Sequence, residues 1–276
     1  MRSFTPSLLL LIAALVRASS QADTDNTSSG EGAAWVTPHE QFSSSAGVLG
    51  CKIDTNRVAY WPGSVDCNNI CVSLSYEGRS VKLLRIDTSQ GAHDISYDAW
   101  NYLYTGYSAT EQPTTGGAVA MNYEYLDPSE CADLIHTDGN KLPFSAPSGT
   151  NLLISCFDQP DSWVAQNYVL YNIVDSVCSW GYDETCTLDW PAANQAACPH
   201  TLGSLESLTS TPVYNIQYGT GQTVLASTGQ VVEDGASSGG GSTGIKGLNG
   251  AISSTYQLGS LLGFWVALQC VFLGFI

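Results

Sequence analysis

The sequence has few basic residues. Nine Lys and Arg stand against 25 Asp and Glu, which gives a net charge of −16. Proteins that bind nucleic acids need a basic surface that neutralises phosphates, and anionic lipids attract basic segments in the same way. The composition therefore argues against both partners, and we predict no nucleic-acid binding. Charged residues make up only 12% of the chain, a balance typical of an extracellular β-rich protein.

The sequence also lacks the short motifs of several enzyme classes. Gly-x-Ser-x-Gly occurs only within the Gly/Ser-rich stretch 233–249 and not between a predicted strand and a predicted helix, as a nucleophile elbow requires, and there is no glycine-rich phosphate loop and no calcium-loop pattern. These absences give no reason to expect a triad hydrolase or a nucleotide-dependent enzyme. We therefore predict that the protein needs no cofactor.

The cysteines are numerous enough to cross-link the chain. Of nine cysteines, Cys270 lies in a C-terminal apolar run, and eight remain: Cys51, Cys67, Cys71, Cys131, Cys156, Cys178, Cys186 and Cys198. An even number in a secreted chain predicts four disulfides, although the sequence leaves their pairing open. A zinc site is the alternative, but the cysteine spacings lack the accompanying histidines of zinc modules. We predict disulfides and no metal.

The N-terminal region resembles a secretory signal peptide. Arg2 precedes the apolar run 8–16, and small residues follow at 18–20. Residues 1–20 are therefore predicted to be a cleaved signal peptide, with an N-terminal anchor as the alternative. Residues 21–49 are rich in Ser, Thr, Ala, Gly and acidic residues, which predicts a flexible leader. Asn26 begins an Asn-Thr-Ser sequon and is a predicted glycosylation site.

The C-terminal region has the pattern of a GPI-attachment signal. The apolar run 258–276 has no polar residue after it, and a small-residue triplet begins at Asn249. We predict attachment at Asn249, removal of residues 250–276, and contact with the membrane through the lipid alone. A site among residues 239–244 and an uncleaved anchoring helix are the alternatives. Residues 233–249 are rich in Gly and Ser, which predicts a flexible linker.

The central stretch, residues 67–100, contains the clearest local pattern. Residues 72–76 alternate apolar and polar, as a half-buried strand does, and residues 81–86 form a returning strand. Residues 77–80 include a Gly and predict a hairpin turn between the two strands. After a loop, Asp94 or Ser96 is predicted to cap a short helix.

This stretch resembles the core of the double-psi β-barrels of expansins, barwins and family-45 endoglucanases. DISYDAW at 94–100 is similar to the Asp-Leu-Ser-x-x-Ala-Phe motif of these families. Residues 117–131 are similar to the Gly-Ile-Val-x-Val-x-Tyr…Cys strand that closes such barrels. The resemblance covers about residues 51–131. It implies a mainly β fold with a six-stranded double-psi β-barrel at residues 50–131.

The chain beyond the predicted barrel divides into two further parts. Residues 132–203 are predicted to form a disulfide-rich α+β elaboration, with a short strand at 151–156 and a helix at 161–178. The helix is expected because apolar residues recur there every three or four positions. Residues 204–232 contain two β-rich runs around Gly219-Thr220-Gly221, which predicts a β-hairpin.

The resemblance implies a site centred on Asp94. In the related hydrolases this Asp lies in an open groove and acts as general acid, which needs a raised pKa. Hydrolysis also needs a second carboxylate, for which Asp66, Asp87 and Asp98 are the candidates. The cellulase relatives carry their catalytic base directly after a Tyr-Trp pair. Pro62 occupies that place here, which is a departure from the hydrolytic pattern.

We predict that a polysaccharide groove is formed by Asp94, Asp87 and two exposed aromatic residues, Trp61 and Tyr97. Aromatic faces stack on sugar rings because their surfaces are apolar. The leading hypothesis is a GPI-anchored protein of the outer leaflet or of a fungal-type cell wall. It would bind or loosen a cell-wall polysaccharide without cleaving it, as expansins do. The oligomeric state is not predicted.

Two alternatives remain open from the sequence. One is a glycoside hydrolase or lytic transglycosylase that uses Asp94 as its catalytic acid. The other is a surface adhesin or effector that keeps the barrel only as a scaffold, since a fold does not determine a function. A second groove carboxylate favours the enzyme, whereas a lack of glycan affinity favours the adhesin.

Overall fold

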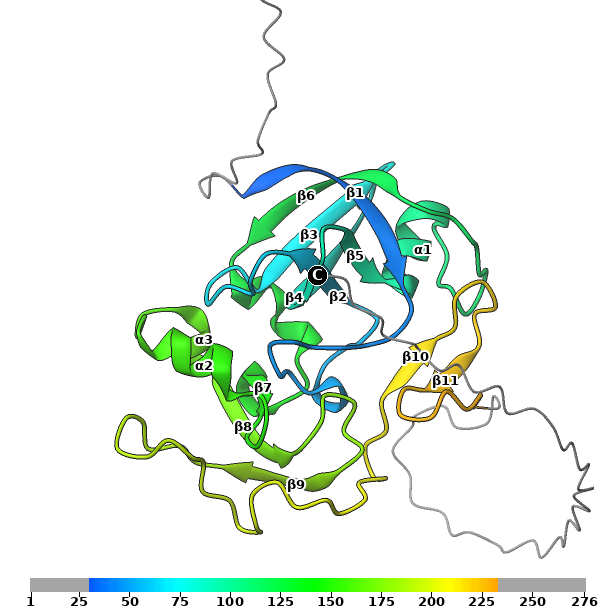
Figure 1. The fold of residues 1–276 in the computed structure, drawn as a ribbon. Helices are drawn as coiled ribbons and strands as arrows, with labels where there is room; N and C mark the ends of the chain where they lie inside the picture. The colour runs from blue at the N-terminus through cyan, green and yellow to red at the C-terminus, as the bar shows by residue number, and fades with distance from the viewer. Residues whose placement is uncertain (1–29, 233–276) are drawn as a thin grey trace, which may run out of the picture. The chain divides into compact units, whose positions relative to one another are not determined.

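The computed structural model describes residues 30–232, and its core is a closed β-barrel (Figure 1). The strand order is β1-β5-β2-β4-β3-β6. The β1–β5 and β2–β4 pairs are parallel, and the other neighbours are antiparallel. The sequence analysis predicted a six-stranded barrel but not the directions of its strands. The strands are β1 (Glu31–His39), β2 (Val58–Pro62), β3 (Cys71–Tyr76), β4 (Arg79–Ser89), β5 (His93–Ser96) and β6 (Val119–Leu126).

The β3–β4 hairpin forms where the sequence predicted it. Val72 and Leu74 are fully buried, whereas the intervening Ser73 is only half-buried, as expected for a strand with one face toward the core. The turn consists of Glu77 and Gly78, which have φ values of 48° and 79°. Two consecutive positive φ values suit the twist of a tight hairpin, so the turn connects the strands directly.

The predicted flexible leader at residues 21–49 is wrong over its described part. Glu31–His39 forms β1, which pairs with both β5 and β6 and thereby closes the barrel. Ala34 and Val36 are buried inside, and Trp35 lies on the outer face. Residues 42–49 also contribute buried side chains, including Phe42. The barrel region therefore begins at residue 31, and residues 21–29 lie outside the described part of the chain.

Helix α1 (Tyr97–Thr105) packs against the barrel interior, where Trp100 and Leu103 are fully buried. Ser96 occupies the position before the helix, as predicted, but its side chain does not cap it. The Ser96 hydroxyl instead donates to the Thr55 carbonyl at 2.7 Å and accepts from the Val58 amide at 3.0 Å. These bonds fix the junction of β5 and α1 to the start of β2.

The elaboration contains a three-stranded sheet of order β7-β8-β9 and two short helices. An apolar cluster distinct from the one inside the barrel, which includes Leu84, Phe144 and Leu153, joins the elaboration to the barrel. Its elements are β7 (Leu142–Ser145), β8 (Tyr168–Ile173), β9 (Gly181–Cys186), α2 (Thr150–Phe157) and α3 (Trp163–Gln166). Three 3-10 segments, η1 (Gly50–Lys52), η2 (Pro128–Leu134) and η3 (Asp138–Asn140), complete the connections.

Two predictions of secondary structure in this region are wrong. Within the predicted helix at 161–178, only α3 is helical, and residues 168–173 form β8, which pairs with β7 and β9. The predicted strand at 151–156 is part of α2. Leu153 and Cys156 are buried three residues apart, which is helical spacing. Short apolar runs fit both the helical and the strand period, and here the pairing and packing of each segment decide which structure forms.

The eight described cysteines form four disulfides, as predicted. The pairs are Cys51–Cys178, Cys67–Cys156, Cys71–Cys131 and Cys186–Cys198. The first two join the barrel region to the elaboration. Four disulfides indicate an oxidising, secreted environment. The predicted fold class, mainly β with a six-stranded barrel and a disulfide-rich α+β elaboration, is confirmed.

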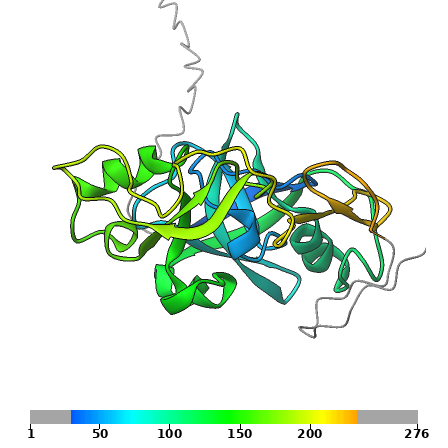
Figure 2. The same ribbon diagram turned by 90° about the horizontal axis from the view of Figure 1, so that it is seen from below.

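The predicted C-terminal hairpin is present and packs on the barrel. Strands β10 (Tyr214–Ile216) and β11 (Thr223–Leu225) pair antiparallel. The Asn215 side chain accepts a hydrogen bond from the Phe42 amide, and the Tyr218 ring lies 5.0 Å from that of Tyr97. Figure 2 shows this hairpin beside α1, on the opposite side of the barrel from α2 and α3. Within residues 30–232, no helix is long and apolar enough to cross a membrane.

Candidate functional site

Asp94 lies on β5, where it is half-buried. The strand register places it opposite Thr37 of β1 on one side and opposite Tyr60 of β2 on the other. The Thr37 hydroxyl donates a hydrogen bond to the Asp94 carboxylate. The carboxylate is therefore oriented by its neighbour and remains within reach of solvent.

Tyr60 lies beneath this position and is almost fully buried. The pKa of its phenol is raised, mainly by burial. The hydrogen bond with Ser96 lowers this pKa, whereas the negative charges of Asp87 and Asp94 raise it further. The phenol therefore stays neutral at physiological pH. The His39 ring lies over it, with ring centroids 4.2 Å apart. Two packed aromatic rings therefore adjoin the Asp94 position.

Asp87, the second predicted groove carboxylate, is buried and fully engaged. It accepts hydrogen bonds from the Ser45 amide at 2.8 Å, from the Thr88 amide at 2.7 Å and from the Ser43 hydroxyl. Only 6% of its surface is exposed. Its carboxylate holds residues 43–45 against the end of β4, so it does not present a free oxygen to a ligand.

The other candidate carboxylates also have structural partners. Asp98 forms an ion pair with Arg57 at 2.9 Å and accepts hydrogen bonds from Ser108 and from the Ala109 amide. Asp66 accepts from the amides of two following residues, as an Asx turn does. Neither carboxylate is arranged as the partner of Asp94.

The prediction that Trp61 and Tyr97 are exposed is wrong, because each is only 2% exposed. Trp61 follows the buried Ala59 by two residues and therefore points to the same inner face of the barrel. Its ring packs against those of His93 at 4.9 Å and Tyr123 at 5.0 Å. The Tyr97 hydroxyl donates to the Thr114 carbonyl and accepts from two backbone amides. Neither residue can stack on a sugar in this arrangement.

The exposed aromatic beside Asp94 is Trp35, which the sequence analysis missed. Trp35 is 68% exposed and lies two residues before Thr37 on the outer face of β1. Its cross-strand partner on β6 is the small Ala120. The signal in the sequence was the alternation of Ala34 and Val36 with Trp35 and Thr37, which was hidden inside a Ser- and Gly-rich segment.

The outer face of β1 continues across β6 onto β3, where the surface is hollowed. This hollow has a volume of about 480 Å³. Its lining is mostly polar and consists of Glu31, Gly32, Ser73, Ser75, Asn122, Tyr123 and Glu124. A separate polar pocket, which Tyr60 and Ser96 help to line, has a volume of only about 10 Å³, which is room for one water molecule at most.

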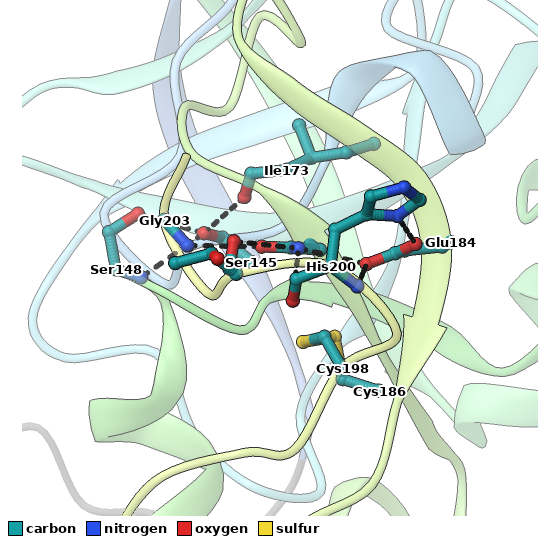
Figure 3. Close-up of a disulfide and its surroundings, with 10 residues drawn as sticks. Ser145, Ser148, Ile173, Glu184, Cys186, Cys198, His200 and Gly203 are labelled. Atoms are coloured by element: carbon teal, nitrogen blue, oxygen red, sulfur yellow. Dashed lines mark hydrogen bonds and ion pairs between the residues drawn. A yellow bond between two sulfur atoms is a disulfide. The ribbon is translucent and has the colours of Figure 1, made fainter. Parts of the chain in front are cut away.

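A second group of polar side chains surrounds the Cys186–Cys198 disulfide in the elaboration (Figure 3). Glu184 accepts hydrogen bonds from the buried Asn172 at 2.9 Å and from His200 Nδ1 at 2.6 Å. Burial raises the pKa of Glu184, but the hydrogen bonds from His200 and Asn172 outweigh it and lower the pKa overall. These bonds attach the His200 segment to the sheet, which is a structural role.

The serines near this group do not form a hydrolytic dyad with the histidine. The Ser145 hydroxyl bonds to the Ser148 hydroxyl and to the Ile173 carbonyl, and Figure 3 shows His200 directed toward Glu184. Within residues 30–232, no group of three or more His, Cys, Asp or Glu side chains is placed to hold a metal ion. The strand face around Asp94 and Trp35 is therefore the leading candidate site.

Comparison with known proteins adds no further assignment. No protein-family model matches this sequence, and no curated protein matches it at a significant level. The resemblance to expansin-like barrels stays a prediction, and the functional argument depends on the geometry of the site.

Proposed function

We propose that this protein binds a polysaccharide along the outer face of β1 and does not cleave it. The observation that carries the proposal is the position of Trp35, which is 68% exposed on the same face as Thr37 and Asp94. An exposed indole offers a flat apolar surface for a sugar ring. The carboxylate of Asp94 accepts hydrogen bonds from sugar hydroxyls, and its bond to Thr37 fixes its direction.

The arrangement of carboxylates favours binding over hydrolysis. A glycoside hydrolase needs two carboxyl groups on opposite sides of the scissile bond. Asp87 is buried under three hydrogen bonds, and Asp98 is paired with Arg57. Asp94 therefore stands without a catalytic partner among the carboxylates that the sequence suggested. This supports an expansin-like role in which binding energy separates chains.

We place the protein at the cell surface, attached by a GPI anchor at Asn249, in contact with a cell wall. The four disulfides agree with passage through the secretory pathway. The anchor and the wall are proposed from the sequence pattern, because Asn249 and the sequon at Asn26 lie outside the described residues. Release of the protein from intact cells by a phosphatidylinositol-specific phospholipase is the expected result, and retention would contradict the anchor.

The binding proposal is tested with the full chain extracted in a mild detergent. The protein is incubated with insoluble chitin, β-glucan, cellulose and peptidoglycan, and both depletion from solution and released reducing sugar are measured. We expect binding to at least one polymer without sugar release, and weaker binding by Trp35→Ala and Asp94→Asn. Trp180→Ala is the matched control, because Trp180 is 44% exposed and precedes β9 in the elaboration.

Each outcome of this experiment decides between the hypotheses. Sugar release that Asp94→Asn abolishes would make the protein a hydrolase. Binding that Trp180→Ala weakens as much as Trp35→Ala would remove the β1 face from the proposal. Failure to bind any of the four polymers or a charged derivative of them would favour a protein partner.

A further inference from the structure

The hollow on the outer face of β1, β6 and β3 carries uncompensated negative charge. Glu31 and Glu124 lie directly opposite each other in the antiparallel β1–β6 pair. Like charges at directly opposed positions destabilise a sheet. Neither residue takes part in any of the ion pairs found within residues 30–232. The lysine of the adjoining strand, Lys82, is bound to Glu130 at 2.7 Å.

The rest of the lining suits a hydrated, hydrogen-bonding ligand. Ser73, Ser75 and Asn122 offer hydroxyl and amide groups beside the two carboxylates. A volume of about 480 Å³ falls within the range of small-ligand sites. The hollow is therefore large enough for a sugar residue and polar enough to bind one.

The hollow and the Asp94 site belong to one continuous strand face. Glu31, Trp35 and Thr37 all lie on β1, with Trp35 between the other two. Six residues of extended strand span about 20 Å. A polymer lying along β1 would meet Asp94 near one end, the Trp35 indole in the middle, and the facing pair of Glu31 and Glu124 at the other end.

We propose that the polysaccharide bound by this face carries free amino groups, as a deacetylated glucosamine polymer does. An ammonium group placed between Glu31 and Glu124 removes their mutual repulsion and forms charge-assisted hydrogen bonds. A neutral polymer leaves the two carboxylates uncompensated, and a polymer of uronic acids is repelled by them. The inference rests on the proposed function, because it names the substrate class of the same face. The net charge of −16 attracts such a polycation at long range.

The test compares two polymers that share one backbone: insoluble chitosan and fully acetylated chitin. They differ only in whether the nitrogen is a free amine or an amide. Full-length protein in mild detergent is titrated against each, together with Glu31→Gln/Glu124→Gln. The control is Glu111→Gln/Glu206→Gln, which makes the same change of charge at two other exposed positions. Thermal melting checks that both double variants remain folded.

We expect wild type to bind chitosan at least about tenfold more tightly than chitin. The Glu31→Gln/Glu124→Gln variant should lose most of this preference, whereas the control should keep it. Trp35→Ala should weaken binding to both polymers, because stacking does not depend on the amine.

The outcomes separate this inference from the proposed function. Equal binding of chitin and chitosan, or tight binding of chitin alone, overturns the amino-polymer inference and leaves polysaccharide binding intact. Equal losses in the two double variants mean that only the overall charge attracts chitosan, which also overturns the inference. Failure of wild type to bind these two polymers or the neutral glucans defeats both proposals together.

Discussion

Thr37 on β1 and Asp94 on β5 are neighbours in a parallel strand pair, and the Thr37 hydroxyl donates a hydrogen bond to the Asp94 carboxylate. The two residues are 57 positions apart in the sequence. Their contact links the strand that carries the exposed Trp35 with the strand that carries the family-like motif. The candidate site exists only because the barrel closes through β1.

The first prediction concerns this contact. Thr37→Val keeps the β-branched shape that a strand favours but removes the hydroxyl that orients Asp94. Because a hydrogen bond to a charged group contributes roughly 1.5–3 kcal/mol, we expect polysaccharide affinity to fall about tenfold. Binding isotherms on the polymer identified above measure the change. Thr185→Val, at an exposed position on β9, is the control and should bind as wild type does.

The second prediction contrasts two tryptophans with opposite environments. Trp35→Ala should change the free energy of unfolding by less than about 0.5 kcal/mol, because its side chain lies mostly in solvent. Trp61→Ala should cost about 3–5 kcal/mol, since it empties a packed site in the barrel. Urea unfolding of both variants measures the difference. Similar costs for the two variants would contradict the assignment of inner and outer faces.

The third prediction concerns a close approach of two backbone segments. Gly47 has a φ of 78°, and a Cβ atom there would lie 2.2 Å from the Gly149 Cα atom. Gly47→Ala should therefore destabilise the protein by several kcal/mol. Gly78 has a similar φ but open space around it. Gly78→Ala should therefore lower the free energy of unfolding by only about 1–2 kcal/mol. Thermal melting compares the two, and an equal shift would contradict the backbone contact.

The fourth prediction concerns the disulfides. Loss of Cys67–Cys156 frees a loop with a sequence separation of 89, whereas loss of Cys186–Cys198 frees one with a separation of 12. Loop-closure entropy then makes the first loss more costly by about 2 kcal/mol. Paired Cys→Ser variants, unfolded in urea, test the order. A greater loss from Cys186→Ser/Cys198→Ser would mean that the hydrogen bonds around Glu184 depend on that disulfide.

The fifth prediction concerns pH. The hydrogen bonds of Glu184 hold its pKa below the ordinary value in the folded state, so its deprotonated form is favoured by folding. The resulting stabilisation is complete above the unfolded-state pKa of about 4.3 and is lost as the pH falls through the lower folded-state value. Glu184→Gln should therefore flatten the decline of stability as the pH falls below about 4.3. An unchanged pH dependence would contradict a stabilising role for Glu184.

Local patterns account for the parts of the fold that sequence analysis predicted well. The β3–β4 hairpin depends on alternation and on a turn at Gly78, both of which are encoded within a few residues. The same holds for the β10–β11 hairpin. The helix predicted at 161–178 failed because the pairing of β8 with β7 and β9 overrides local spacing.

The candidate site was only partly predictable. Asp94 was found because it lies in a motif whose order along the chain is recognisable. Trp35 was missed because its flanking composition suggested a leader, and its strand partners on β5 and β6 lie far along the sequence. Trp61 was placed wrongly because no local pattern states which face of β2 points into the barrel.

The sequence by itself determined the acidic charge and the eight cysteines that lie before the C-terminal apolar run, which are properties of composition. The six-stranded barrel and the choice of Asp94 came from the resemblance to a known family. Only the tertiary structure decided which cysteines pair, that residues 31–39 close the barrel, and that Trp35 faces solvent while Trp61 faces the core. The physical reason is that strand pairing joins distant segments, and the side of the sheet that becomes buried is settled only when the barrel closes.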